Sequence, residues 1–163
     1  MLELKLVLSG IIVVGCYITG WFYGENIKKR RDTLRVFLKK LAEAESYMLA
    51  GVPVREIYSK LSGQDDVGEM FCRMAESGEQ NVLKLWEKEI ETVLLSNEDK
   101  RILKEFAKGL GNTTTGQQKN NFKIVLTAIS GQLDEAEKKY EKEGLICRKL
   151  GFCAGLLLSI FLI

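Results

Sequence analysis

The sequence predicts an all-α protein, an antiparallel bundle of about six helices flanked by N- and C-terminal transmembrane helices. Three observations indicate this fold class. A run of 19 residues from Leu6 to Gly24 carries no charge, and a second run of 14 uncharged residues extends from Leu150 to Ile163. Between these runs, apolar residues recur every three or four positions, which is the spacing of amphipathic helices.

The two uncharged runs differ in length, and only the first is long enough by itself to span a bilayer. At 1.5 Å per residue the first covers about 28 Å and the second about 21 Å, against a hydrocarbon core of about 30 Å. The second becomes long enough if residues 145–147 enter the interface while the basic pair after them reaches back to water. We therefore predict three parts: an N-terminal transmembrane segment (1–24), a cytoplasmic helical bundle (25–149) and a C-terminal transmembrane segment (150–163).

Basic residues next to the two runs predict the orientation in the membrane. Those that follow the first run or precede the second are Lys28, Lys29, Arg30, Arg31, Arg148 and Lys149. Since basic residues mark the cytoplasmic side, the middle part is expected in the cytoplasm and both termini outside. Contact of the first cluster with anionic lipid is an alternative role.

A lipoprotein signal is an alternative reading of the N-terminus. The stretch Val13-Val14-Gly15-Cys16 fits the small-residue pattern before a lipidated cysteine. However, the apolar run continues through Tyr23, where a mature lipoprotein would turn polar, and this favours a membrane span.

The first helices of the middle part are predicted from an apolar stripe and from two residues that mark helix ends. The stripe predicts a helix over 32–50 with Leu34, Phe37, Leu41, Ala44 and Met48 facing inward. Gly51 is expected to cap the end of this helix. Pro53, which lacks an N–H, is expected in the first turn of a short helix that ends near Gly63.

Three further helices are expected from capping residues. Asp65 or Asp66 caps a helix that stops around Gly78, and Asn81 opens the next. Ser96 or Asn97 caps a helix that closes at Gly111, with acidic residues at its positive end. The inward positions of these three helices are Val67, Met70, Phe71, Met74, Val82, Leu85, Trp86, Ile90, Val93, Leu94, Ile102, Leu103, Phe106 and Leu110.

A long last helix is expected from about Gln117 towards Lys149, continuous with the second uncharged run. Its inward face would consist of Phe122, Val125, Leu126, Ile129 and Leu133.

Sites for catalysis, cofactors or metals are not predicted. The chain has no histidine and no C-x-x-C pair, so the usual general base and zinc ligands are absent. The stretch from Gly109 to Gly116 resembles a phosphate loop but lacks its Lys and follows a helix. Glu87, Glu89 and Glu91 alternate with apolar positions, which is typical of a solvated helix face. We expect no enzyme, no cofactor and, with a net charge of +2, no nucleic-acid partner.

Two pairs of glycines predict helix packing in the membrane. Gly20 and Gly24 lie near the end of the first run, and Gly151 and Gly155 near the start of the second. Small residues spaced in this way let helix backbones approach closely, within one chain or between chains of an oligomer.

End to end, the chain resembles the stage III sporulation protein AB family of endospore-forming bacteria. The resemblance rests on the first run with its basic cluster, on Ala50-Gly51-Val52-Pro53-Val54 and on Leu103…Phe106…Leu110-Gly111. It rests further on Gln117, on Glu135-Ala136 and on the ending Lys149-Leu150-Gly151-Phe152…Gly155-Leu156.

The middle part also resembles the cytoplasmic domain of type II secretion and type IV pilus platform proteins. The resemblance lies in two turns, Gly51-Val52-Pro53 and Glu76-Ser77-Gly78-Glu79. The chain departs from its relatives at Asn112-Thr113-Thr114-Thr115, where they often place an acidic residue after the Leu-Gly.

These resemblances imply a mother-cell membrane protein of the channel that connects mother cell and forespore. They imply a non-enzymatic platform that docks a secretion-type ATPase and other membrane subunits, with membrane lipid as a further partner. Residues expected to bind protein or to form turns are Gly51, Pro53, Gly78, Gly111 and Gln117. The alternatives are a membrane-anchored sensor whose bundle binds a small ligand and, less in keeping with so large a middle part, a pore former.

Overall fold

The computed structural model describes residues 2–79, 81–110, 115–144, 146, 153, 154 and 157, except for the side chains of residues 2–10, 12 and 115. Every regular element in this part of the chain is helical, which confirms the all-α class. The chain divides into two compact units, residues 32–134 and residues 1–31 with 135–163. Within the described residues, no helix combines the length and the hydropathy that crossing a bilayer requires.

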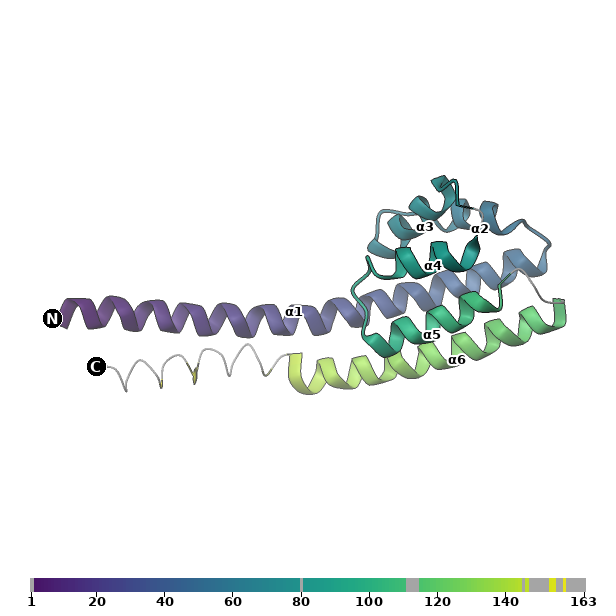
Figure 1. Cartoon of the computed structure of the whole chain (residues 1–163). Helices are drawn as coiled ribbons and strands as arrows, with labels where there is room; N and C mark the ends of the chain where they lie inside the picture. The colour runs from purple at the N-terminus through teal and green to yellow at the C-terminus, as the bar shows by residue number, and fades with distance from the viewer. Residues whose placement is uncertain are drawn as a thin grey trace. The chain divides into compact units, whose positions relative to one another are not determined.

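Six α-helices and one π-helical turn make up the described chain (Figure 1). They are α1 (Leu2–Leu49), α2 (Val54–Leu61), α3 (Asp66–Glu76), α4 (Val82–Ile90), α5 (Asn97–Lys108), α6 (Thr115–Lys139) and the π-helical turn η1 (Tyr140–Gly144). The helix expected over 32–50 is therefore the last part of one long helix. The last helix begins two residues before Gln117, and a π-helical turn that the sequence does not predict comes after it at Tyr140.

The helix ends of unit 32–134 are capped mostly as the sequence predicts. Asp65 accepts a hydrogen bond from the Gly68 N–H at 2.7 Å, and Asn81 accepts one from the Lys84 N–H at 3.1 Å. Ser96 and Asp99 form a reciprocal capping box at the start of α5. These side chains satisfy amide groups that have no partner within their helix, and so they set where α3, α4 and α5 begin.

Two helices end earlier than the sequence predicts. α4 ends at Ile90 and the chain turns through residues 91–95, so Val93 is buried whereas Leu94, expected inward, is 43% exposed. α5 ends at Lys108 with Gly109 as its C-cap, so the helix does not extend to Gly111. The Asn121 amide of α6 donates a hydrogen bond to the Phe106 carbonyl at 3.0 Å. This carbonyl lies in the last turn of α5, where carbonyl groups lack an i+4 partner within the helix, so the Asn121 side chain helps to satisfy it.

An aromatic cluster forms the centre of unit 32–134, and each of the six α-helices contributes one ring to it. The members, in chain order, are Phe37, Tyr58, Phe71, Trp86, Phe106 and Phe122. Neighbouring ring centroids lie 4.9–6.5 Å apart, mostly tilted or edge to face, and every ring is buried. Such geometry is the favoured one for aromatic pairs, and it joins all six helices in one core.

Aliphatic side chains complete this core. Most of the side chains that the apolar stripes placed inward are buried, among them Leu34, Leu41, Met70, Ile90, Leu103 and Ile129. Met48, Val82, Ile102, Leu110 and Leu126 are only half-buried.

The unit of residues 1–31 and 135–163 pairs α1 with the π-helical turn. The Tyr23 hydroxyl donates a hydrogen bond to Glu143 at 3.4 Å, and the Arg31 guanidinium lies 4.2 Å from the centre of the Tyr140 ring. Gly144, the last residue of the turn, packs against that same ring. A cation over an aromatic face is attractive, so this contact ties α1 to the π-helical turn.

Candidate protein-binding surface

The turn between α1 and α2 contains two of the predicted turn residues. Gly51 has a φ of +78°, and the Gly51 and Val52 N–H groups donate to the Met48 and Tyr47 carbonyls, both at 3.0 Å. This pattern is a Schellman motif, the helix ending that favours glycine. Pro53 lies one position before the first turn expected for it, as the N-cap residue of α2, where its carbonyl accepts the Ile57 N–H.

The other predicted turn and binding residues lie on separate parts of the chain. Gly78 is exposed after α3, with open space around its α-carbon, and Gln117 is exposed in the first turn of α6. Gly111 lies outside the described residues. The four described residues of this set, Gly51, Pro53, Gly78 and Gln117, therefore lie at three separate positions along the chain rather than in one turn.

The residues predicted to pack in the membrane are described only on α1. Gly20 is half-buried and Gly24 is buried. Gly151 and Gly155 lie outside the described residues, as do Arg148 and Lys149 of the basic flank. Packing between the two glycine pairs stays a prediction.

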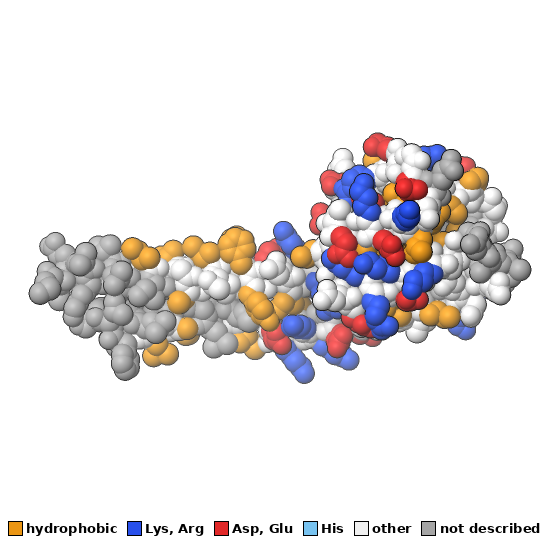
Figure 2. Space-filling view, viewed as in Figure 1, with side chains coloured by type: hydrophobic (Ala, Val, Ile, Leu, Met, Phe, Trp, Pro, Cys, Tyr) orange, Lys and Arg blue, Asp and Glu red, His pale blue; other side chains and the backbone are white. Residues whose placement is uncertain are grey.

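Exposed apolar side chains lie along α1 from Ile11 to Tyr23 and end just before the basic cluster. They include three aromatic residues in succession, Trp21, Phe22 and Tyr23, which are 45–60% exposed. One turn further on, Lys28 approaches Glu25 at 4.0 Å and Lys29 is exposed. Figure 2 shows hydrophobic side chains along this part of α1.

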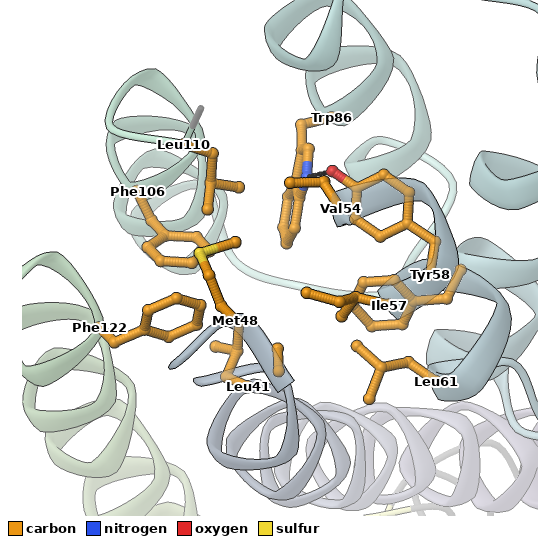
Figure 3. A pocket seen from close by; sticks show the side chains of 12 residues that line it. Leu41, Met48, Val54, Ile57, Tyr58, Leu61, Trp86, Phe106, Leu110 and Phe122 are labelled. Carbon is orange, nitrogen blue, oxygen red and sulfur yellow. Dashed lines mark hydrogen bonds between the residues drawn. The ribbon is translucent and has the colours of Figure 1, made fainter. Parts of the chain in front are cut away.

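The described core of unit 32–134 contains a small apolar cavity. Its volume is about 20 Å³, and it lies beside Met48, Val54, Leu110 and the aromatic cluster (Figure 3). Two of its lining residues share a buried hydrogen bond, in which the Trp86 indole N–H donates to the Tyr58 hydroxyl at 2.9 Å. Burial raises the pKa of Tyr58 to about 12. The cavity has room for about one water molecule, whereas small-molecule sites occupy about 300–1,000 Å³.

A larger depression lies on the surface between α4 and α5, and we call it the charged groove. Its volume is about 360 Å³, and its lining residues are Glu87, Glu91, Asn97, Lys100, Arg101, Lys104, Glu105 and Lys108. Figure 2 shows acidic and basic side chains gathered over these helices. Three of its basic residues, Lys100, Lys104 and Lys108, lie along one face of α5 because they recur at four-residue intervals.

Glu91 lies between two lysines at the centre of the charged groove. Its two carboxylate oxygens accept hydrogen bonds from Lys100 at 2.6 Å and Lys104 at 2.8 Å. These two bonds lower the pKa of Glu91 to about 2. Since α4 ends at Ile90, Glu91 is its C-cap residue and lies where the chain turns towards α5.

Glu87 and Glu91 are exposed, as their alternation with apolar residues suggests, but Glu89 is not a solvated side chain. Glu89 is buried, and its carboxylate accepts a hydrogen bond from Arg73 of α3 at 2.7 Å. Arg73 also donates to the Thr92 hydroxyl, which tethers the turn after α4. A buried carboxylate needs such a partner, and none is visible in sequence because Arg73 lies on another helix.

The described residues contain no group of three or more Cys, Asp and Glu side chains that could hold a metal ion. Cys16, Cys72 and Cys153 are free thiols.

Comparison with known proteins identifies the family. The family model of stage III sporulation protein AB matches residues 5–163. The chain belongs to this family. Stage III sporulation protein AB of Bacillus subtilis (strain 168) is 27% identical over 175 residues, which cover 98% of this chain and 99% of the relative.

Membership of the family supports a role in sporulation and confirms the resemblance found in the sequence. No solved structure matches the chain. The likeness of the middle part to secretion and pilus platform proteins therefore stays a prediction.

Proposed function

We propose that the chain is a membrane-anchored, non-enzymatic scaffold subunit of a secretion-like channel complex that functions in sporulation. Its helical bundle would dock a secretion-type ATPase on the cytoplasmic side, and its N- and C-terminal segments would hold it in the mother-cell membrane and contact other subunits. Family membership supports the setting in sporulation.

The small size of the core cavity that the described residues line is the observation that carries the scaffold role. At about 20 Å³, this cavity is too small for a substrate or a signalling ligand. Function then resides on the surface, where the charged groove offers partner-binding groups. The same observation weighs against the alternative of a sensor that binds a small ligand inside its bundle.

The membrane anchor is supported by the run of uncharged residues from Leu6 to Gly24 and by the aromatic residues near its end. Trp21 and Tyr23 are the residue types that gather at the boundary between lipid and water, and they are exposed one turn before Lys28 and Lys29. A chain anchored in this way would present its bundle to soluble partners.

Affinity capture of the full-length protein from detergent-solubilised sporulating cells tests the scaffold role. We expect a secretion-type ATPase and other membrane subunits to be recovered by the tagged protein. As controls, charges are reversed on one exposed face at a time. Reversal on the docking face should abolish recovery of the partner while the protein remains folded. Recovery of the bait alone, at normal expression and with a normal thermal midpoint, would refute the proposal.

Fluorescence quenching tests the membrane anchor separately. The chain has two tryptophans, Trp21 on the exposed apolar surface of α1 and Trp86 in the core. In vesicles with brominated acyl chains we expect quenching of Trp21 only, so the variant W21F should show almost none. Equal quenching in the wild type and W21F would contradict insertion of this segment.

A further inference from the structure

We propose that the charged groove between α4 and α5 binds an acidic α-helical segment of a partner protein, and that Glu91 occupies the place of a partner carboxylate until binding. The inference rests on the proposed scaffold function and names the docking site and the chemistry of the segment it accepts.

Charge balance in the groove favours an acidic partner. Four basic residues and three acidic residues line it. Arg101 and Lys108 each have an acidic neighbour on α5, Glu98 and Glu105, both at 2.6 Å. The two central lysines, by contrast, share the single carboxylate of Glu91. Two partner carboxylates in place of Glu91 would give each of these lysines its own partner.

The shape of the groove favours a helix over a compact ligand. Its α5 wall extends from Asn97 to Lys108, and 12 helical residues cover about 18 Å. Lys100 and Lys104 are one turn apart, about 6 Å along the axis. Carboxylates spaced three or four residues apart on a partner helix have the same separation, so two of them would meet the two lysines at once.

Partial burial strengthens contacts at this position. The side chain of Lys100 is 18% exposed and that of Lys104 is 34% exposed, whereas Lys108 at the end of the groove is 53% exposed. Charges partly withdrawn from water interact more strongly than fully solvated ones. An incoming carboxylate would therefore bind best at the centre of the groove, where Glu91 now lies.

Glu91 competes with a partner carboxylate for Lys100 and Lys104, so removal of its charge should favour binding. The substitution E91Q removes the internal competitor while preserving the size of the side chain. It should therefore strengthen binding of the acidic segment, whereas K100E with K104E should weaken it by about tenfold or more. A purely structural role for these three residues predicts no gain in binding from E91Q.

Zero-length carbodiimide cross-linking tests the site in permeabilised sporulating cells that express the full-length protein. The reagent joins a lysine amine to a carboxylate in direct contact, and mass spectrometry locates the bond. Internal bonds from Glu91 to Lys100 and Lys104 show that the reagent reached the groove. We expect further bonds from these lysines to Asp or Glu residues of a second protein, and more of them in E91Q than in the wild type.

The matched control is E56Q, which removes one carboxylate from the exposed Lys60–Glu56 pair on α2, where the two charges lie 3.4 Å apart. This variant should leave the yield of intermolecular bonds from the groove unchanged. The proposal is refuted if the internal bonds form in the wild type but neither the wild type nor E91Q forms an intermolecular bond from the groove. Affinity capture separates this failure from that of the scaffold role, because partners recovered without groove bonds would leave the scaffold role intact.

Anionic lipid is the competing occupant, and the same experiment excludes or supports it. Lipid phosphates form no amide bond to lysine under these conditions. Salt-sensitive binding of the wild type to phosphatidylglycerol vesicles that K100E/K104E abolishes, together with no protein bond from the groove, would assign the groove to the membrane surface and overturn the proposal.

Discussion

Gly51 should be a structural residue whose replacement destabilises the bundle, and Gly78 provides a matched control. A Cβ atom at either position would meet no heavy atom within 4 Å, so crowding plays no part. Of the two glycines, only Gly51 has a positive φ. For a residue with a Cβ, the left-handed conformation costs about 1–2 kcal/mol. Replacement of glycine also lowers the conformational entropy of the unfolded chain, which stabilises the folded protein by about 0.4–1 kcal/mol.

The comparison of G51A with G78A cancels the unfolded-state contribution because both substitutions add the same methyl group. The difference that remains is the conformational cost at Gly51, about 1–2 kcal/mol. In a domain of this size 1 kcal/mol corresponds to roughly 4–8 °C. We therefore expect the thermal midpoint of G51A to lie at least about 4 °C below that of G78A.

The assay is thermal unfolding of the full-length protein in detergent, monitored by circular dichroism in the far ultraviolet. G51N should fall between the wild type and G51A, since asparagine tolerates the left-handed region better than alanine does. Affinity capture of G51A completes the test. Equal midpoints for G51A and G78A, with loss of partners only in G51A, would refute the structural role and assign Gly51 to partner contact.

Three further predictions concern the core and the charged groove. Y58F leaves the buried Trp86 N–H without its acceptor, and it should destabilise the protein by about 1–3 kcal/mol in chemical denaturation monitored by tryptophan fluorescence; an unchanged midpoint would contradict this. G68A places a Cβ 2.6–2.8 Å from backbone atoms of Gly63 and should lower the thermal midpoint far more than G63A, whose nearest neighbours are side-chain atoms at 3.3 Å. Similar midpoints would contradict the close approach of α3 to the loop that follows α2. Because the pKa of Glu91 falls from 4.5 to about 2 in the folded protein, its carboxylate stabilises the fold above pH 4.5, and this contribution is lost as the pH falls to about 2. The difference in thermal midpoint between the wild type and E91Q should therefore shrink over this pH range, and a constant difference would contradict the pairing.

Local signals in the sequence predict most of the helices because the determinants of a helix end lie within a few residues. Four residues cap helices as the sequence predicts. The side chains of Asp65, Asn81 and Ser96 cap helix N-termini, and Gly51 ends α1. The apolar stripes likewise identify most of the buried side chains, since a three- or four-residue spacing defines one face of a helix.

Features that depend on distant residues were not predictable in this way. The spacing rule extends α4 to Leu94, but the tertiary bonds of Arg73 to Glu89 and Thr92 stabilise a turn there instead. No local sequence pattern indicates the π-helical turn at Tyr140 or shows that α1 is one continuous helix. Within the charged groove, the i, i+4 spacing of Lys100 and Lys104 is visible in sequence, whereas the return of Glu91 towards them requires knowledge of the turn.

The six-ring cluster has a consequence for how the bundle can be divided. Because Phe37 comes from the first helix and Phe122 from the last, the core closes only when both ends of residues 32–134 are present. A fragment that stops before α6 exposes the Phe106 ring, and one that starts after α1 exposes that of Phe71. The bundle should therefore unfold in a single all-or-none transition, and a protease that cuts any one interhelical turn should release no stable subdomain.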